Sequence, residues 1–243
     1  MHSIRDGRLK VFIGYDPRED AAYQVCRHSL LRHASIPIEV SPLRQQDLRE
    51  RGLYTRADDP NASTEFSLTR FLTPYLAVSA GLSMFVDCDF LFTKDIGEMV
   101  RGLDAERAVH VVRHDYVPCH AVKMDGRPQA TYPRKNWSSL MIFNGSHAAV
   151  RALGPEVVNR ASASFLHRLE WVRDELIGGL PSDWNFLVGD YEPTLALPAG
   201  IHFTNGGPWF ANCQHFDYAE LWRAEHDAVL SQMDVMPART GHP

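Results

Sequence analysis

The chain has 243 residues, of which 44% are hydrophobic and 23% charged, and its net charge is −5 at pH 7. These values suit a soluble globular protein and argue against a general nucleic-acid binder, which usually carries a basic surface. No apolar run is long enough to span a membrane, and the scattered cysteines indicate a reducing, cytoplasmic compartment without a disulfide framework.

The first part of the chain alternates between strand-like and helix-like patterns. Apolar residues recur at helical spacing in some segments and form short apolar runs, typical of buried strands, in others. The predicted elements are a strand at 8–16, a helix at 19–33, a strand at 36–43, a polar surface loop at 48–64 and a helix at 63–81. Pro74 is expected to kink this last helix, and Gly81 to end it.

The same alternation continues to the end of the chain. The predicted elements here are a strand at 83–92, a helix at 95–103, strands at 108–116 and 138–145, helices at 146–153 and 155–172, a strand at 201–207 and a helix at 218–233. Strands that alternate with helices predict an α/β fold with a mostly parallel central sheet flanked by helices. We expect a single domain over residues 1–236 and a flexible tail over residues 237–243.

Two aspartates, Asp87 and Asp89, lie within a segment that is otherwise almost entirely apolar. Burying an unpartnered carboxylate is costly, so this placement needs a reason. Side chains alternate along a strand, so both carboxylates start on the same side and Cys88 points the other way. Two such carboxylates form a hard-oxygen site that suits Mg²⁺ or Mn²⁺, especially when diphosphate oxygens complete the coordination.

A third acid, Asp16, also follows a predicted strand. Ligands of parallel α/β sheets bind beyond the carboxyl ends of the strands. The positions of Asp16 and of the Asp87/Asp89 pair at strand ends therefore agree in predicting a binding site at that edge.

Four segments, in chain order, carry a resemblance to a known family: VFIGYDPREDAAYQV, SLTRFLTPYL followed by MFVDCDFLFTKDI, KNWSSLMIFN, and HFTNGGPW. They resemble the GT-A nucleotide-sugar glycosyltransferases, most of all family 8, which includes glycogenin and bacterial lipopolysaccharide galactosyltransferases. The resemblance implies a metal-dependent hexosyltransferase that uses a nucleoside diphosphate sugar, with a UDP-sugar as the expected donor and the anomeric configuration retained. The acceptor hydroxyl, on a saccharide, a lipid-linked molecule or a protein, is not indicated.

The resemblance also implies a role for individual residues. The ligands of a Mn²⁺ or Mg²⁺ ion would be Asp87, Asp89 and His202. The catalytic residues, which would lie near the reacting carbon, are Asp174 and Glu175. Contacts with the donor fall to Gly14, Tyr15, Asp16, Arg70, Asp87, Cys88, Asp89, Asn136, Ser138, Gly206 and Gly207.

The sequence departs from the family pattern at two places. The family has a lysine that touches the diphosphate just before its Pro-Trp pair, whereas Gly207 stands there in this chain, and the distance from His202 to Trp209 is one residue short. Glu175 stands where the family often has glutamine.

Other interpretations remain open. A phosphatase of the haloacid dehalogenase type also has Asp-x-Asp after a strand, but it has Thr or Val where this chain has Leu91. A nucleotidyltransferase usually has a glycine-rich basic loop, and a non-catalytic sugar-nucleotide-binding module would not need all three metal ligands. His114, Cys119 and His120 lie close in sequence but match no standard zinc spacing.

Overall fold

The computed structural model describes residues 7–58, 62–78, 81–115, 133–213 and 215–235. Within these ranges six strands form the main sheet, in the order β2-β1-β3-β6-β5-β7. The strands are β1 (Leu9–Tyr15), β2 (Ile38–Arg44), β3 (Leu82–Val86), β5 (Val109–Val112), β6 (Leu140–Asn144) and β7 (Ile177–Leu180). β6 is antiparallel to both of its neighbours, and the other pairings are parallel. The predicted mostly parallel sheet is therefore confirmed.

A second, smaller sheet of three strands lies beside the carboxyl edge of the main one in the described part of the chain. Its strands, in the order β4-β9-β8, are β4 (Phe90–Phe92), β9 (Gly200–His202) and β8 (Phe186–Leu187). The predicted strand at 83–92 is therefore two strands, β3 and β4, which belong to different sheets. The short connection between them, residues 87–89, lies where the two sheets meet.

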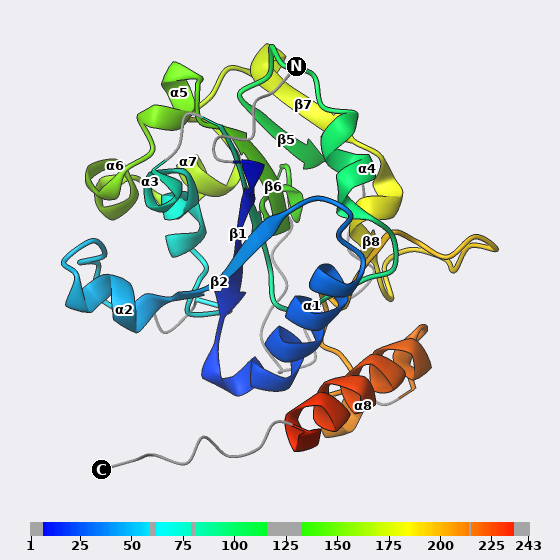
Figure 1. Cartoon of the computed structure of the whole chain (residues 1–243). Coiled ribbons are helices and arrows are strands. Elements are labelled where there is room, and N and C mark those ends of the chain that lie inside the picture. Colours follow the sequence, from blue (N-terminus) through cyan, green and yellow to red (C-terminus); the bar gives the residue numbers. More distant parts are fainter. Residues whose placement is uncertain (1–6, 59–61, 79–80, 116–132, 214, 236–243) are drawn as a thin grey trace.

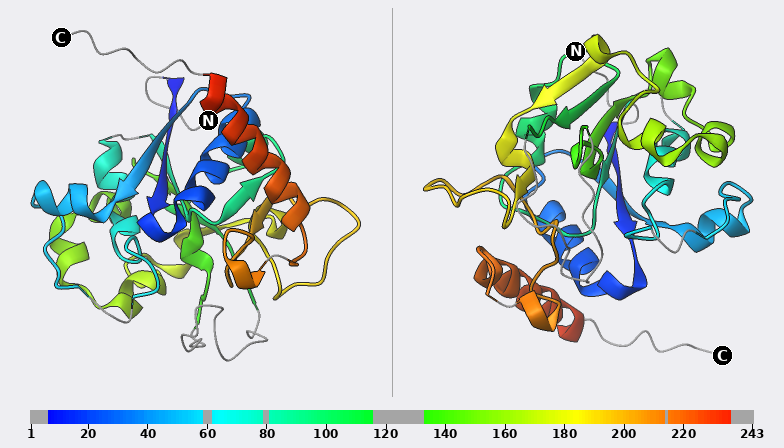
Figure 2. Two further views of the ribbon diagram at one scale, coloured as in Figure 1. Left: turned by 90° about the horizontal axis from the view of Figure 1, so that it is seen from below. Right: turned by 180° about the vertical axis from the view of Figure 1, so that it is seen from behind.

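Helices cover both sides of the main sheet, as Figures 1 and 2 show. The helices are α1 (Asp20–Arg32), α2 (Gln45–Glu50), α3 (Thr73–Ala77), α4 (Ile96–Arg101), α5 (Ala148–Arg151), α6 (Pro155–Arg160), α7 (Ala163–His167) and α8 (Ala219–Val235). α3, α5, α6 and α7 gather on one side, whereas α1 and α8 lie together on the other. None of the helices in the described ranges is long and apolar enough to cross a membrane.

The core explains why the central strands are apolar along their whole length. Every residue of β3, β5 and β6 is buried, because helices or loops cover both faces of these strands. A separate apolar cluster fills the space between the small sheet and the helices α1 and α8. It consists of Val25, Leu91, Phe186, Val188, Ile201, Phe203 and Trp222.

Several predicted elements differ from those observed. The helix expected at 63–81 is only a 3₁₀ turn, η3 (Thr69–Leu72), followed by α3, and Pro74 lies in the first turn of α3. It causes no kink there, because the first turn of a helix does not need the amide hydrogen that proline lacks. The helix expected at 155–172 is split into α6 and α7, since Ala161 and Ser162 are extended and the Ser162 side chain caps α7.

Among the α-helices and strands of the described residues, those not predicted are α2, β7 and β8. α2 ends within the segment 48–64 that was expected to be a polar loop, and only Leu48 of this helix is buried. β7 contains Gly178 and Gly179, which have low strand propensity. A side chain at Gly178 would overlap the ring of His110 on the neighbouring strand β5, so tertiary packing accounts for that glycine.

Candidate metal centre

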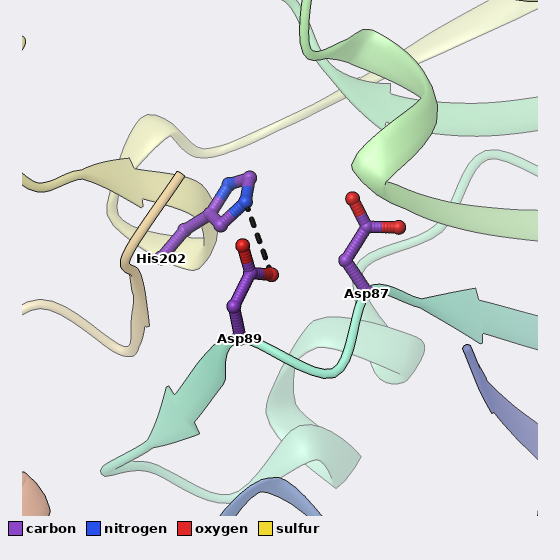
Figure 3. A group of neighbouring side chains, drawn as sticks. All are labelled: Asp87, Asp89 and His202. Atoms are coloured by element: carbon purple, nitrogen blue, oxygen red, sulfur yellow. Dashed lines mark ion pairs between the residues drawn. The ribbon is translucent and has the colours of Figure 1, made fainter. Parts of the chain in front are cut away.

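Asp87, Asp89 and His202 come together where the two sheets meet (Figure 3). Asp87 follows β3, Asp89 precedes β4, and His202 ends β9, where it pairs directly with Phe90. Backbone bonds fix the junction, since the amide of Asp87 donates to Ser139 O (2.9 Å) and the amide of Phe203 donates to Asp89 O (3.0 Å). One potential ligand atom from each residue lies within 4.8 Å of the other two.

The three side chains fit a divalent cation. Two metal–ligand bonds of about 2.1 Å span up to about 4.2 Å, so the cluster is close to the size that one ion requires. Burial, together with the nearby Asp89 carboxylate, raises the pKa of Asp87 above its usual range, although Arg70 acts against that rise. Two crowded carboxylates and an imidazole form a donor set that suits a hard or borderline divalent ion.

His202 is held rigidly in this cluster. Its side chain is 2% exposed, and its ring stacks on Phe90 with centroids 4.3 Å apart. Nε2 faces Asp89 Oδ1 at 3.3 Å, while Nδ1 lies 2.8 Å from Asn185 Oδ1. One ring nitrogen therefore points at the carboxylates and the other at an amide that sequence analysis did not identify.

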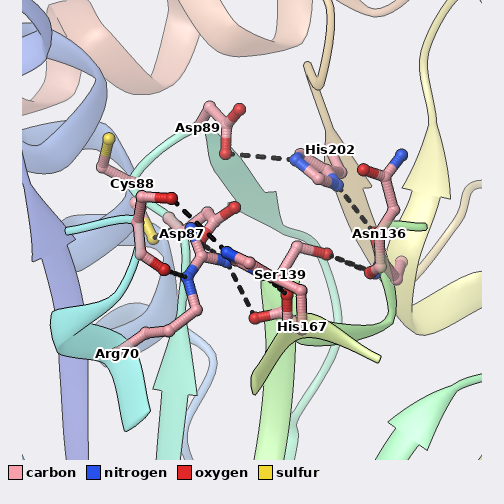
Figure 4. Close-up of polar contacts among 12 residues, drawn as sticks. Arg70, Asp87, Cys88, Asp89, Asn136, Ser139, His167 and His202 are labelled. Atoms are coloured by element: carbon pink, nitrogen blue, oxygen red, sulfur yellow. Dashed lines mark hydrogen bonds and ion pairs between the residues drawn. The ribbon is translucent and has the colours of Figure 1, made fainter. Parts of the chain in front are cut away.

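Arg70 is buried beside Asp87 and serves as its counter-ion (Figure 4). Nη1 lies 2.8 Å from Asp87 Oδ1 and donates to Ser138 O (2.9 Å), and Nε donates to Ser67 O (3.0 Å). The guanidinium also lies over the ring of Phe85, 4.9 Å from its centroid. The structure thus brings Arg70 to the predicted site, with its donors directed at protein groups.

Asn136 and Ser138 border the same region through the 3₁₀ turn η4 (Trp137–Ser139). Asn136 has a left-handed backbone with φ 63°, and its carbonyl accepts from Ser139 Oγ at 2.7 Å. Ser138 is buried, and its Oγ lies 2.9 Å from His167 Nδ1. Burial, followed by the charge of Arg70, lowers the pKa of His167 to about 3, so this ring is neutral near pH 7.

The end of β1 and the loop after it carry the other predicted donor contacts. Phe66 covers Gly14 so closely that a side chain at residue 14 would overlap its ring. The hydroxyl of Tyr15 donates to Asp20 Oδ1 at 3.0 Å. Asp16 is fully buried and accepts from Arg18 Nε (2.9 Å) and Nη2 (2.6 Å). Although burial opposes ionisation, these hydrogen bonds hold the pKa of Asp16 below its usual value.

Glu19, at the end of the same loop, is an acid that sequence analysis did not identify. Burial, followed by the charges of Asp89 and Asp16, raises its pKa well above the usual range. The thiol of Cys88 lies 3.9 Å from Glu19 Oε2, and residues 87–89 connect β3 and β4 without belonging to either strand. The only sequence signal for Glu19 was its place just after the carboxyl end of β1.

The glycine loop after β9 packs tightly on itself. Gly206 has φ 103°, a conformation that side-chain-bearing residues rarely adopt, and its amide donates to Phe203 O at 2.8 Å. A Cβ at Gly207 would lie well under 3.0 Å from the indole of Trp209. The place that holds lysine in the similar family is therefore filled by an aromatic ring.

Asp174 and Glu175 are not brought to this cluster. They precede β7, whose first residue Ile177 pairs with Val109 at the amino end of β5, whereas Asp87 lies beyond the carboxyl end of β3. Their side chains are 77% and 60% exposed and pair with Arg134 (2.6 Å) and Arg173 (3.1 Å). Of the histidine and cysteine cluster considered for zinc, Cys119 and His120 lie outside the described residues, and His114 Nδ1 is 2.7 Å from the hydroxyl of Tyr191.

Comparison with solved structures identifies the fold as that of GT-A glycosyltransferases. The bifunctional glycosyltransferase WbbM matches with a TM-score of 0.67 at 17% identity, covering 96% of this chain and 52% of that one. GlyE of Streptococcus pneumoniae TIGR4 matches with a TM-score of 0.60 at 15% identity, covering 96% of this chain and 66% of that one. The galactosyltransferase LgtC, solved with donor and acceptor sugar analogues, matches with a TM-score of 0.59 at 12% identity, covering 95% of this chain and 98% of that one.

The sequence has a much more similar relative. It is 48% identical over 222 residues to Protein CDI of Arabidopsis thaliana, covering 89% of this chain and 85% of that protein. The chain therefore belongs to the same family as Protein CDI. No protein-family model matches the sequence.

Proposed function

We propose that this protein is a metal-dependent glycosyltransferase that moves a hexose from a nucleoside diphosphate sugar, with a UDP-sugar as the expected donor, to an acceptor hydroxyl. The observation that carries the proposal is the convergence of Asp87, Asp89 and His202 at the carboxyl edge of a GT-A sheet. Ligands of open α/β sheets bind at that edge. The proposal includes retention of the anomeric configuration and a relationship to family 8, both of which rest on the sequence resemblance, and residues 1–236 as one catalytic domain.

A divalent ion held by these three residues would stabilise the negative charge that develops on the leaving diphosphate. The protein's own groups prepare that site. Arg70 keeps Asp87 ionised and oriented by direct pairing at 2.8 Å. His202 contributes a neutral nitrogen, which Mn²⁺ accepts more readily than Mg²⁺ does, so we expect a preference for Mn²⁺.

Two parts of the proposal depend on residues at a distance from the cluster. Contacts of Gly14, Tyr15, Asp16, Asn136 and Ser138 with the donor remain predictions. So does catalysis by Asp174 and Glu175, whose exposed carboxylates lie at the amino end of β7.

The test is calorimetric titration of UDP with and without Mn²⁺, using the wild-type protein, Asp89→Asn and a control, Glu156→Gln. Glu156 is 78% exposed on α6, so this change removes one carboxylate without disturbing the site. We expect tight UDP binding only with Mn²⁺ in the wild type and the control, and weak binding in both conditions for Asp89→Asn. Equal affinity for UDP in EDTA and in Mn²⁺ would refute the metal bridge. Hydrolysis of a panel of sugar nucleotides would then identify the donor.

A further inference from the structure

A buried chain of hydrogen bonds extends from η4 to the imidazole of His202. Ser139 Oγ donates to Asn136 O at 2.7 Å. The amide nitrogen of Asn185 donates to Ser139 Oγ at 2.8 Å, and its amide oxygen faces His202 Nδ1 at 2.8 Å. Asn185 is 0% exposed, and Ser139 and His202 are each 2% exposed, so these protein partners satisfy one another out of contact with water.

The direction of the first bond, from Ser139 Oγ to Asn136 O, determines the arrangement of hydrogens along this chain. A serine hydroxyl has a single hydrogen, and that of Ser139 is used on the Asn136 carbonyl, which can only accept. Ser139 Oγ must therefore accept from Asn185, so the NH₂ group of Asn185 faces Ser139 and its oxygen faces His202. An oxygen at that position requires a hydrogen on Nδ1 of His202.

The consequence for the metal centre follows from the two ring nitrogens. When Nδ1 carries the hydrogen of a neutral imidazole, Nε2 presents its lone pair to Asp89 Oδ1, 3.3 Å away. The Nε2 lone pair and the Asp89 oxygen face each other and become complementary when a positive charge lies between them, either a metal ion or a proton on Nε2. Histidines that bind metals are commonly fixed in this way, with the second nitrogen donating to a protein oxygen.

The fold places Asn185 here through close packing of two segments. Asn185 ends the 3₁₀ turn η6 (Ser182–Asn185), and η6 packs against β9. A Cβ at Gly200, the first residue of β9, would lie under 3.0 Å from the carbonyl of Trp184. The missing side chain at Gly200 therefore allows η6 to approach closely enough for Asn185 to reach His202.

We propose that Asn185 is the positioning residue of the metal centre: it fixes His202 in the Nδ1–H tautomer and so presents Nε2 as the ligand. The inference rests on the proposed metal binding by Asp87, Asp89 and His202. It assigns Asn185 no contact with substrate. It predicts that losing the amide oxygen removes the histidine from the metal's coordination while both carboxylates remain.

The experiment uses Mn²⁺ as its probe, with pulsed EPR to detect coupling to a histidine nitrogen and a Mn²⁺ titration to measure affinity. Asn185→Leu removes the acceptor, whereas Asn185→Asp keeps an oxygen that can accept from Nδ1. We expect the leucine variant to lose the nitrogen coupling and to bind Mn²⁺ about 10- to 100-fold more weakly. The aspartate variant should retain the coupling.

Asn144→Leu is the matched control. Asn144 is also buried and hydrogen-bonded, but it ends β6 at the opposite edge of the sheet, where it donates to Ala105 O and Arg107 O. This variant should lower the melting temperature in EDTA without changing the nitrogen coupling. If Asn185→Leu fails to fold, Asn185→Ala removes the same amide oxygen without introducing a bulky side chain.

The outcomes distinguish metal ligation by His202 from the positioning role of Asn185. A wild-type protein that binds Mn²⁺ without nitrogen coupling would overturn ligation by His202, and the inference with it. Wild-type coupling that persists in the leucine or alanine variant would overturn the role of Asn185 alone. Loss of coupling in Asn185→Asp to the same extent as in Asn185→Leu would show that the amide oxygen is not what fixes the ring.

Discussion

Gly207→Ala tests whether the loop after β9 is as tightly closed as the structure indicates. A Cβ at residue 207 would meet three atoms of the Trp209 indole, all under 3.0 Å away. The indole has little freedom to retreat, because its centroid lies 6.0 Å from that of Phe203, 5.6 Å from that of Phe210 and 5.5 Å from that of Trp222. The added methyl group must therefore displace an aromatic cluster.

Two opposing effects determine the magnitude. Overpacking a well-filled site costs about 1–3 kcal/mol. Replacing glycine by alanine also restricts the unfolded chain, which recovers about 0.4–1 kcal/mol. The net loss is about 1–2 kcal/mol, and for a chain of this size each kcal/mol lowers the melting temperature by about 2–4 °C. We expect Gly207→Ala to melt several degrees below the wild type.

The assay is thermal unfolding in EDTA, so that metal binding makes no contribution. Gly102→Ala is the control, because the nearest atom to a Cβ there is 3.8 Å away and its φ of −85° suits any residue. Adding Trp209→Phe to Gly207→Ala should recover part of the loss, since the smaller ring leaves room for the methyl group. If Gly207→Ala and Gly102→Ala have the same melting temperature, the indole of Trp209 does not fill the space beside residue 207.

Three further predictions follow from other contacts. Arg70→Ala leaves Asp87, whose side chain is 14% exposed, without its counter-ion and should destabilise the fold by about 3 kcal/mol in urea unfolding, the lower end for buried pairs, whereas Arg70→Lys should lose less; equal stability of the two variants would contradict the pairing. Glu225→Ala removes the carboxylate on α8 that pairs with His28 (2.6 Å) and Arg32 (2.7 Å) on α1. The free energy of unfolding should fall by about 1–2 kcal/mol, because the side chain of Arg32 is half-exposed. An unchanged unfolding midpoint would show that apolar packing alone holds α8. Mn²⁺ at about 100 times its Kd should stabilise the wild type by about 2.7 kcal/mol in thermal unfolding, and His202→Ala should lose the preference for Mn²⁺ over Mg²⁺; an unaltered preference would remove His202 from the ligand set.

Local pattern was sufficient to predict the elements that lead to the site. The apolar runs at β1 and β3 and the helical spacing of α1 correspond closely to the observed elements. Asp87 and Asp89 were identified because burying two carboxylates in an apolar segment costs free energy unless a partner or an ion compensates. Arg70, which the resemblance placed at the donor, is buried at the metal centre, where it pairs with Asp87.

Long-range packing determined what the sequence could not reveal. Asn185 lies 17 residues from His202 in sequence, and their contact depends on the pairing of two short strands, one of which contains only two residues. β7 was missed because it contains two glycines, and the space beside one of them, Gly178, is filled by the ring of His110 on β5. The positions of Asp174 and Glu175 could not be inferred without knowing that a strand begins directly after them.

The break between β3 and β4 connects the fold to the chemistry proposed for it. Had the segment at 83–92 continued as one strand, Asp87 and Asp89 would both belong to the main sheet, and neither would meet β9. Because the chain changes sheets between them, Asp87 directly follows a strand of the large sheet, whereas Asp89 directly precedes a strand of the small one, which contains His202. An ion bound by all three would therefore link the two sheets. Metal binding should for this reason stabilise a junction that backbone hydrogen bonds already hold, as well as hold the donor.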